Sequence, residues 1–174
     1  SEDGITWDEN PFRVVRGTLN GNIISGLNPD ETYYVRLKAK NSISESPDFS
    51  KVYGAYTSGA SNRVLVVDDF NSYTDSTGSS SHNFVKNYGE AFAGMGIKFE
   101  SASSSAVSNS SQFTPYFASI WFTGNEFETI NSNEQQILSS VLSGLGRVVV
   151  TGSNIALDLD SLGTSQDKAF FNNF

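Results

Sequence analysis

The residues that could do chemistry in this chain follow three short apolar runs, at 64–67, 116–122 and 147–151. Each run has the composition of a buried parallel strand. In open sheets of parallel strands and helices, ligands bind beyond the carboxyl ends of the strands, where the strand order reverses. We therefore expect a crevice formed by the residues that follow the runs. The candidate ligand-binding residues are Asp68, Asp69, Thr123, Asn125, Glu126 and Ser153.

The two adjacent acids, Asp68 and Asp69, have two interpretations. Their carboxylates could bind a cation or another ligand weakly. In the structural interpretation, which we favour, they solvate the end of a strand or cap a loop. No residue is assigned as catalytic and none as a metal ligand, and no cofactor is expected.

The segment Val-Leu-Val-Val-Asp-Asp (64–69) resembles the acidic strand end of response-regulator receiver domains. In such domains, the acids hold Mg²⁺ beside an Asp that accepts phosphate at the end of the third strand. Here the third predicted strand, 116–122, ends in Phe122-Thr123-Gly124 and provides no acceptor. The receiver interpretation is therefore disfavoured.

Nucleophiles are scarce. The absence of cysteine excludes a thiol nucleophile, a disulfide and Cys-ligated metal. Ser153 does not lie in a Gly-x-Ser-x-Gly elbow. The single histidine, His82, has no acidic or histidine partner at the spacing of metal ligands, so we expect a histidine at the surface or at a helix start. A hydrolase built on Ser153 would need a base from His82 or from beyond Phe174.

Composition narrows the classes of partner. The net charge is -8, which argues against nucleic acid, because phosphate binding needs clustered Lys and Arg. No run approaches the roughly 20 apolar residues of a membrane helix, so no membrane span is expected. Some aromatic residues could stack on sugar rings, although we favour places in cores for them. These residues are Trp7, Tyr53, Tyr56, Phe113 and Tyr116.

Residues 63–174 alternate between strand and helix patterns. Strands are predicted at 63–69, 97–99, 116–122 and 147–151. An apolar stripe from Phe84 to Met95 predicts one helix, and the capping box Ser132-x-x-Gln135 opens a second. Seven serines at 101–111 predict a flexible loop, and 165–174 predict the opening of a third helix. The pattern predicts a flavodoxin-like, doubly wound parallel sheet truncated at the C-terminus, its fifth strand lying beyond Phe174.

Residues 1–57 are predicted to be all β. The stretch 33–40 alternates residue by residue, as in a half-buried antiparallel strand, and further short strands are predicted at 5–7, 13–15, 22–24 and 51–57. Asn20-Gly21 suits a tight hairpin turn. The Leu27-x-Pro29 entry before Tyr33 resembles the tyrosine corner and following strand of a fibronectin type III domain, in which the phenol bonds back to upstream backbone.

Three phrases, at 64–69, 119–126 and 150–159, are similar to the non-catalytic, class I glutamine amidotransferase-like domain that follows a fibronectin type III module in bacterial exported proteins. Those proteins are labelled xanthan lyase-like or N-acetylmuramoyl-L-alanine amidase-like. The expected organisation is therefore a mixed two-domain chain. It comprises a partial type III β-sandwich at 1–57, a linker at 58–62, and an incomplete amidotransferase-like α/β domain at 63–174.

This resemblance implies a function and a location. The chain is expected to be a non-catalytic accessory region, used for spacing, docking or binding of glycan or cell wall, in an exported multidomain protein active on carbohydrate or peptidoglycan. Its partners would be other domains of the same polypeptide and a cell-wall glycan or polysaccharide. The location would be secreted, periplasmic or at the cell surface. The alternative is a hydrolase or lyase, amidase-like or polysaccharide lyase-like, with its site in the α/β crevice.

Overall fold

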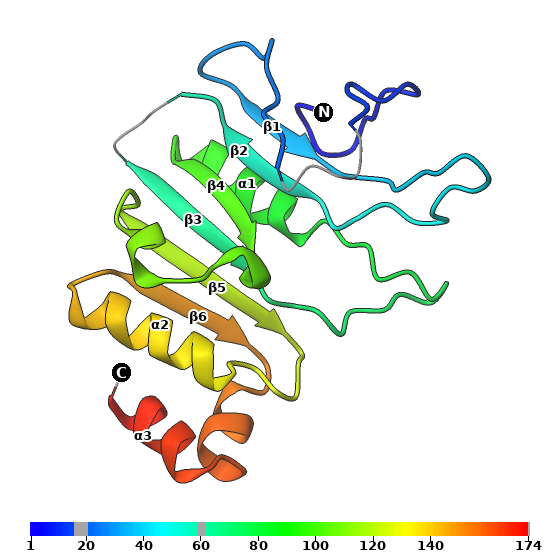
Figure 1. Cartoon of the computed structure of the whole chain (residues 1–174). Helices are drawn as coiled ribbons and strands as arrows, with labels where there is room; N and C mark the ends of the chain where they lie inside the picture. The colour runs from blue at the N-terminus through cyan, green and yellow to red at the C-terminus, as the bar shows by residue number, and fades with distance from the viewer. Residues whose placement is uncertain (16–20, 59–61, 174) are drawn as a thin grey trace.

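In the computed structural model, the strands of the described residues form one mixed sheet of six, in the order β1-β2-β4-β3-β5-β6 (Figure 1). The structure describes residues 1–15, 21–58 and 62–173. Strands β4, β3, β5 and β6 are parallel, whereas β1 and β2 are antiparallel to each other and β2 is antiparallel to β4. The strands are β1 (Thr32–Val35), β2 (Tyr53–Tyr56), β3 (Arg63–Asp68), β4 (Lys98–Ser103), β5 (Ala118–Gly124) and β6 (Val148–Gly152).

Helices cover both faces of the sheet. Helix α1 (Phe84–Gly94) lies on one face, and α2 (Ser132–Ser143) lies on the other with α3 (Ser165–Asn173) beside it (Figure 1). Short helical turns complete the fold: the 3-10 turns η1 (Ser104–Ala106) and η2 (Ser110–Phe113), and the π-helical turn η3 (Leu157–Ser161).

The predicted two-domain fold class, a type III sandwich followed by a separate flavodoxin-like layer, is wrong. Strands β1 and β2 extend the edge of the sheet to which the later strands belong, since Ala55 of β2 pairs with Glu100 of β4. The Ser101 hydroxyl reinforces this junction, because it accepts a hydrogen bond from the Gly54 N–H and donates one to the Gly54 carbonyl, both at 2.7 Å.

The side chain of Tyr34 explains why β1 and β2 dock there. Its ring is buried and packs 6.2 Å from the ring of Phe99 in β4. A Cβ at Gly54 would lie 2.9 Å from this ring, and a Cβ at Gly89 of α1 would lie 2.1 Å from the phenol oxygen. Two glycines, one on β2 and one on α1, thus leave the space that Tyr34 fills. This packing replaces the separate core that a sandwich would need.

The other predictions for residues 1–57 have mixed outcomes. Within residues 1–15 and 21–58, the segments 5–7, 13–15 and 22–24 form no strand, and the strand predicted at 33–40 is limited to β1. The hairpin turn at Asn20-Gly21 and the linker at 58–62 fall partly outside the described residues, at 20 and at 59–61. The local contact of a tyrosine corner is present, because the N–H of Asn28 donates to the Tyr33 phenol oxygen at 3.2 Å.

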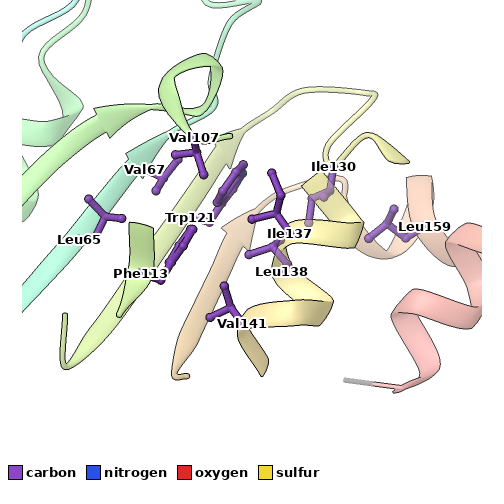
Figure 2. Close-up of a cluster of buried hydrophobic side chains, with 10 residues drawn as sticks. All are labelled: Leu65, Val67, Val107, Phe113, Trp121, Ile130, Ile137, Leu138, Val141 and Leu159. Atoms are coloured by element: carbon purple, nitrogen blue, oxygen red, sulfur yellow. The ribbon is translucent and has the colours of Figure 1, made fainter. Parts of the chain in front are cut away.

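The sheet separates two hydrophobic cores. Successive residues of β3 point to opposite faces, so that Val64 and Val66 join the core under α1, whereas Leu65 and Val67 join the core under α2. The expectation that aromatic residues belong to cores is confirmed for Phe113, which is buried. Figure 2 shows the core under α2, formed by Leu65, Val67, Val107, Phe113, Trp121, Ile130, Ile137, Leu138, Val141 and Leu159.

Most elements predicted after residue 62 form, with two differences. The serine-rich segment 101–111 is not a flexible loop, because 101–103 belong to β4 and the next serines form η1 and begin η2. Phe113 anchors this segment by stacking on Trp121, with ring centroids 6.5 Å apart. The capping box of α2 begins at Asn131 and closes with Glu134, one residue before the predicted pair.

Candidate functional site

The carboxyl ends of β3, β5 and β6 meet at one edge of the sheet, where the crevice was expected. Asp68 lies opposite Phe122, and Gly124 lies opposite Gly152. The loops that follow β5 and β6 are hydrogen-bonded to each other, because the backbone N–H of Ser153 donates to the Gly124 carbonyl at 2.8 Å. The Asn154 side chain also donates, to the carbonyls of Asn125 and Glu126. The structure thus brings Asn125, Glu126 and Ser153 together.

Asp68 is fully buried and has partners within the protein. Its Oδ1 accepts hydrogen bonds from the Lys51 ammonium at 3.3 Å and from the backbone N–H of Phe70 at 3.1 Å. Burial raises the pKa of this carboxyl, while His82 and Lys51 act against the rise. Asp68 therefore caps the loop after β3, as the structural interpretation predicted, but it is buried rather than solvated.

The burial of His82 was not predicted from the sequence. Its side chain is buried, with Nε2 3.5 Å from Asp68 Oδ2 and 3.3 Å from the Phe70 carbonyl oxygen. Burial lowers the pKa of the imidazole, although the Asp68 carboxylate opposes this shift. The prediction of a histidine at the surface or at a helix start is wrong about the surface and right about the helix start, because His82 is buried and directly precedes Asn83, the N-cap of α1. The acidic partner was not predicted. The partner lies 14 residues earlier, at a spacing that no metal or catalytic motif signals.

Asp69 faces the opposite side of the sheet from Asp68. Its Oδ2 accepts a 2.9 Å hydrogen bond from the indole of Trp121, and its Oδ1 accepts one from Asn71 at 3.1 Å. Burial raises the pKa of Asp69 as well. Because the two acids engage different partners on different faces, they do not form a paired-carboxylate site.

Thr123 is enclosed by the fold, and Glu126 is hydrogen-bonded within it. Thr123 is fully buried, and a Cβ on Gly152 would lie 2.1 Å from its hydroxyl oxygen, so the backbone of β6 closes over it. The Glu126 carboxylate accepts a hydrogen bond from the backbone N–H of Ser72, which links the loops after β3 and β5. Thr123 therefore packs beneath the end of β6, and Glu126 holds together the two loops that border the crevice.

A cleft of about 640 Å³ lies between α1 and the carboxyl ends of β5 and β6. Aromatic rings dominate its wall, amide and hydroxyl groups lie at its rim, and none of its lining side chains carries a charge. Of the candidate residues, Ser153 lines it. The lining residues are Phe70, Phe84, Asn87, Tyr88, Ala91, Phe122, Gly124, Thr151, Gly152 and Ser153.

Ring packing fixes the aromatic wall. Tyr88 stacks on Phe122 with centroids 5.3 Å apart, and Phe84 stacks on Phe70 at 5.8 Å. The His82 ring stacks on Phe84, with ring centroids 4.7 Å apart. The helical spacing of Phe84 and Tyr88 is visible in the sequence, but a stripe of this kind is read as core. Their half-exposed position beside Ser153 comes only from the tertiary structure.

Within residues 1–15, 21–58 and 62–173, no group of three or more His, Cys, Asp or Glu side chains is placed to hold a metal ion. In the same ranges, every helix is too short or too polar to cross a membrane. The chain matches no family model, no curated protein and no solved structure.

Proposed function

We propose that this chain is a non-catalytic accessory region that binds a neutral glycan in the cleft between α1 and the ends of β5 and β6. The observation that carries the proposal is the lining of this cleft, in which aromatic rings and neutral polar groups occur without a charged side chain. Binding sites for small ligands combine such an apolar wall with a few polar groups that fix orientation.

Sugar rings suit this lining for a physical reason. A pyranose exposes C–H groups on its faces, which pack against aromatic rings such as Tyr88, and hydroxyls around its edge, which exchange hydrogen bonds with neutral side chains. Asn87, Thr151 and Ser153 supply amide and hydroxyl groups at the rim. An acidic polymer is disfavoured, because the chain carries a net charge of -8 and the cleft offers no cation.

The acids of the crevice support a binding role over a catalytic one. A general acid or base must reach the substrate within hydrogen-bond distance. The Asp68 carboxylate accepts hydrogen bonds from Lys51 and the Phe70 N–H. The Asp69 carboxylate accepts them from Trp121 and Asn71. Neither acid lines the cleft. The hydrolase or lyase alternative therefore has no specific observation in its favour.

The setting of this function is part of the proposal. The resemblance of three sequence phrases to exported bacterial proteins motivates a secreted, periplasmic or cell-surface location. It also motivates partnership with other domains of the same polypeptide and with a cell-wall glycan or polysaccharide. In that setting, the chain would hold a catalytic domain close to its polymer.

Calorimetric titration with neutral tetrasaccharides, chitotetraose and cellotetraose, tests the binding role. Asn87→Ala removes an exposed amide at the rim and is expected to weaken binding about 3- to 10-fold, as for one hydrogen bond. Asn133→Ala, on the exposed surface of α2, is the matched control and should leave affinity unchanged. Equal affinities of the two variants would show that the sugar binds outside this cleft. If neither tetrasaccharide binds, the proposal is wrong.

A second experiment separates binding from catalysis. Asp69→Asn and Glu126→Gln are made in the intact parent protein, and turnover of cell-wall amides and polysaccharides is measured. Unchanged turnover is expected, because neither acid lines a cleft and the amide oxygens of Asn and Gln can accept the hydrogen bonds from Trp121 and Ser72. Turnover by the 174-residue chain alone, lost in these variants, would establish the enzymatic alternative instead.

A further inference from the structure

A second cleft, of about 550 Å³, adjoins the first. Phe70 and Gly124 line both clefts, so the two are neighbours on one surface. The lining of the second cleft is completed by Ser72, Tyr73, Thr74, Asn125 and Phe127. Asn125, a candidate from the sequence, therefore lies in the second cleft, while Ser153 lies in the first.

Gly124 forms part of the boundary between the two clefts. Gly124 has a φ of +59°, and a Cβ at this position would come within 2.3 Å of the Phe70 ring. Only a residue without a side chain allows β5 to end against Phe70 in this conformation. No side chain of residue 124 therefore stands between the two clefts.

The chemistry of the second cleft repeats that of the first. Tyr73 supplies an aromatic surface, and its ring packs edge-on against Phe70 at 5.5 Å and against Phe84 at 5.3 Å. The remaining polar lining groups are hydroxyls and an amide, and none of the lining side chains is charged. A packed group of rings thus runs from the second cleft into the first.

Phe127 is the most unusual side chain of this surface, since 80 % of it is exposed. The loop that carries it is held in place, because the preceding residue, Glu126, accepts hydrogen bonds from the Ser72 N–H through its carboxylate and from Asn154 through its carbonyl. An exposed aromatic ring beside a cleft, on a loop that hydrogen bonds hold in place, is suited to stack on a ligand.

We infer that the two clefts are subsites for one linear, neutral oligosaccharide, which crosses the boundary at Phe70 and Gly124. This inference rests on the proposed function and specifies its ligand as a chain rather than a single sugar. Each cleft alone falls in the size range of a small-ligand site, about 300–1,000 Å³. Because the two clefts share Phe70 and Gly124, a ligand with two recognised parts matches the pair. The uncharged lining of both clefts suits uncharged sugar units throughout.

The test is the dependence of affinity on chain length. The 174-residue chain is titrated calorimetrically with chito- and cello-oligosaccharides of two, four and six units. Two occupied subsites predict affinity at least about tenfold higher for the hexasaccharide than for the disaccharide, because the second contact adds to the first within one molecule. Equal affinities for all lengths would overturn the inference and leave the single-cleft function standing. No binding at any length would instead defeat the proposed function, and the inference with it.

Variants of Phe127 locate the second subsite. Phe127→Ala is expected to weaken hexasaccharide binding about 3- to 10-fold, as for one aromatic contact, and to leave disaccharide binding in the first cleft unchanged. Phe127→Trp should restore the hexasaccharide affinity, because a stacking surface is restored. Phe12→Ala, which removes another phenylalanine that is 67 % exposed, is the control without effect. Equal weakening of both ligands, or of neither, by Phe127→Ala would contradict the two-subsite arrangement.

Discussion

The indole of Trp121 donates a 2.9 Å hydrogen bond to the carboxylate of Asp69, although the two residues are 52 positions apart in the chain. Trp121 is completely buried among the side chains of the core under α2 (Figure 2). The bond satisfies both a buried N–H and a buried carboxylate oxygen. It therefore connects the loop after β3 to the centre of the hydrophobic core. The role of Asp69 is to stabilise the fold.

The first prediction concerns this bond. Trp121→Phe keeps an aromatic ring but removes the N–H donor and part of the buried volume. We expect the free energy of unfolding to fall by about 2–4 kcal/mol, since Asp69 loses a hydrogen bond and a cavity forms. Urea denaturation measures the change. Trp7→Phe, at a half-buried position, should cost about 1 kcal/mol or less. Equal losses in the two variants would show that the bond to Asp69 contributes nothing.

The second prediction concerns the buried contact between Lys51 and Asp68. Asp68→Asn keeps the size of the side chain but leaves the Lys51 ammonium, whose side chain is 16 % exposed, without its carboxylate. The free energy of unfolding should fall by roughly 2–4 kcal/mol, because an uncompensated, largely buried charge remains. Thermal and urea unfolding report the loss. Asp160→Asn, at an exposed position, should change stability by less than about 0.5 kcal/mol. A loss no larger for Asp68→Asn than for Asp160→Asn would rule out a stabilising role of the contact.

The parallel strands and the helices after residue 62 could be predicted because their signals are local. The run ending at Asp68 forms β3, and the stripe beginning at Phe84 forms α1. The place of β1 and β2 could not be predicted in the same way. It depends on the pairing of Ala55 with Glu100, 45 positions later, and on the space that two glycines leave for Tyr34. A short alternating strand fits a sandwich or the edge of a mixed sheet equally well.

The places of the candidate residues at the strand ends could be predicted, but the lining of the clefts could not. Strand ends located the crevice, and Ser153 and Asn125 do line the two clefts. The roles of the acids depend on distant partners, as with Asp68 and His82, and no spacing in the sequence encodes those partners. Tyr88 belongs to a helical stripe whose pattern does not distinguish a buried ring from one that borders a cleft.

The third prediction concerns the boundary between the clefts. Gly124→Ala introduces a Cβ at a positive φ and into the ring of Phe70. Gly78→Ala also places a Cβ at a positive φ, of +85°, but with nothing within 4 Å. The control should therefore cost about 1 kcal/mol from backbone strain, and Gly124→Ala should cost about 1–3 kcal/mol more, because Phe70 must move. Calorimetric unfolding measures both. Equal losses of stability in the two variants would show that the Phe70 ring moves aside without a loss of free energy.

The last prediction concerns Glu134, whose burial raises its pKa from 4.5 to about 7 although the backbone N–H of Asn131 donates to its carboxylate at 2.9 Å. Because the folded state keeps this proton at pH values at which the unfolded chain has lost it, the free energy of unfolding falls as pH rises from 4.5 to about 7. Glu134→Gln removes the titration and can keep the cap, since Gln also serves at this position of a capping box.

We expect Glu134→Gln to leave stability near its wild-type value at pH 4.5 and to raise it by roughly 1–3 kcal/mol at pH 8, where the wild-type carboxylate is charged while buried. Urea titrations at a series of pH values give the difference between variant and wild type, in which the other titrating groups largely cancel. Glu9→Gln, at an exposed position, should give a difference near zero throughout. A Glu134→Gln difference that is flat between pH 4.5 and pH 8 would mean that the buried carboxyl titrates like an exposed one, and that α2 tolerates the charge at no cost.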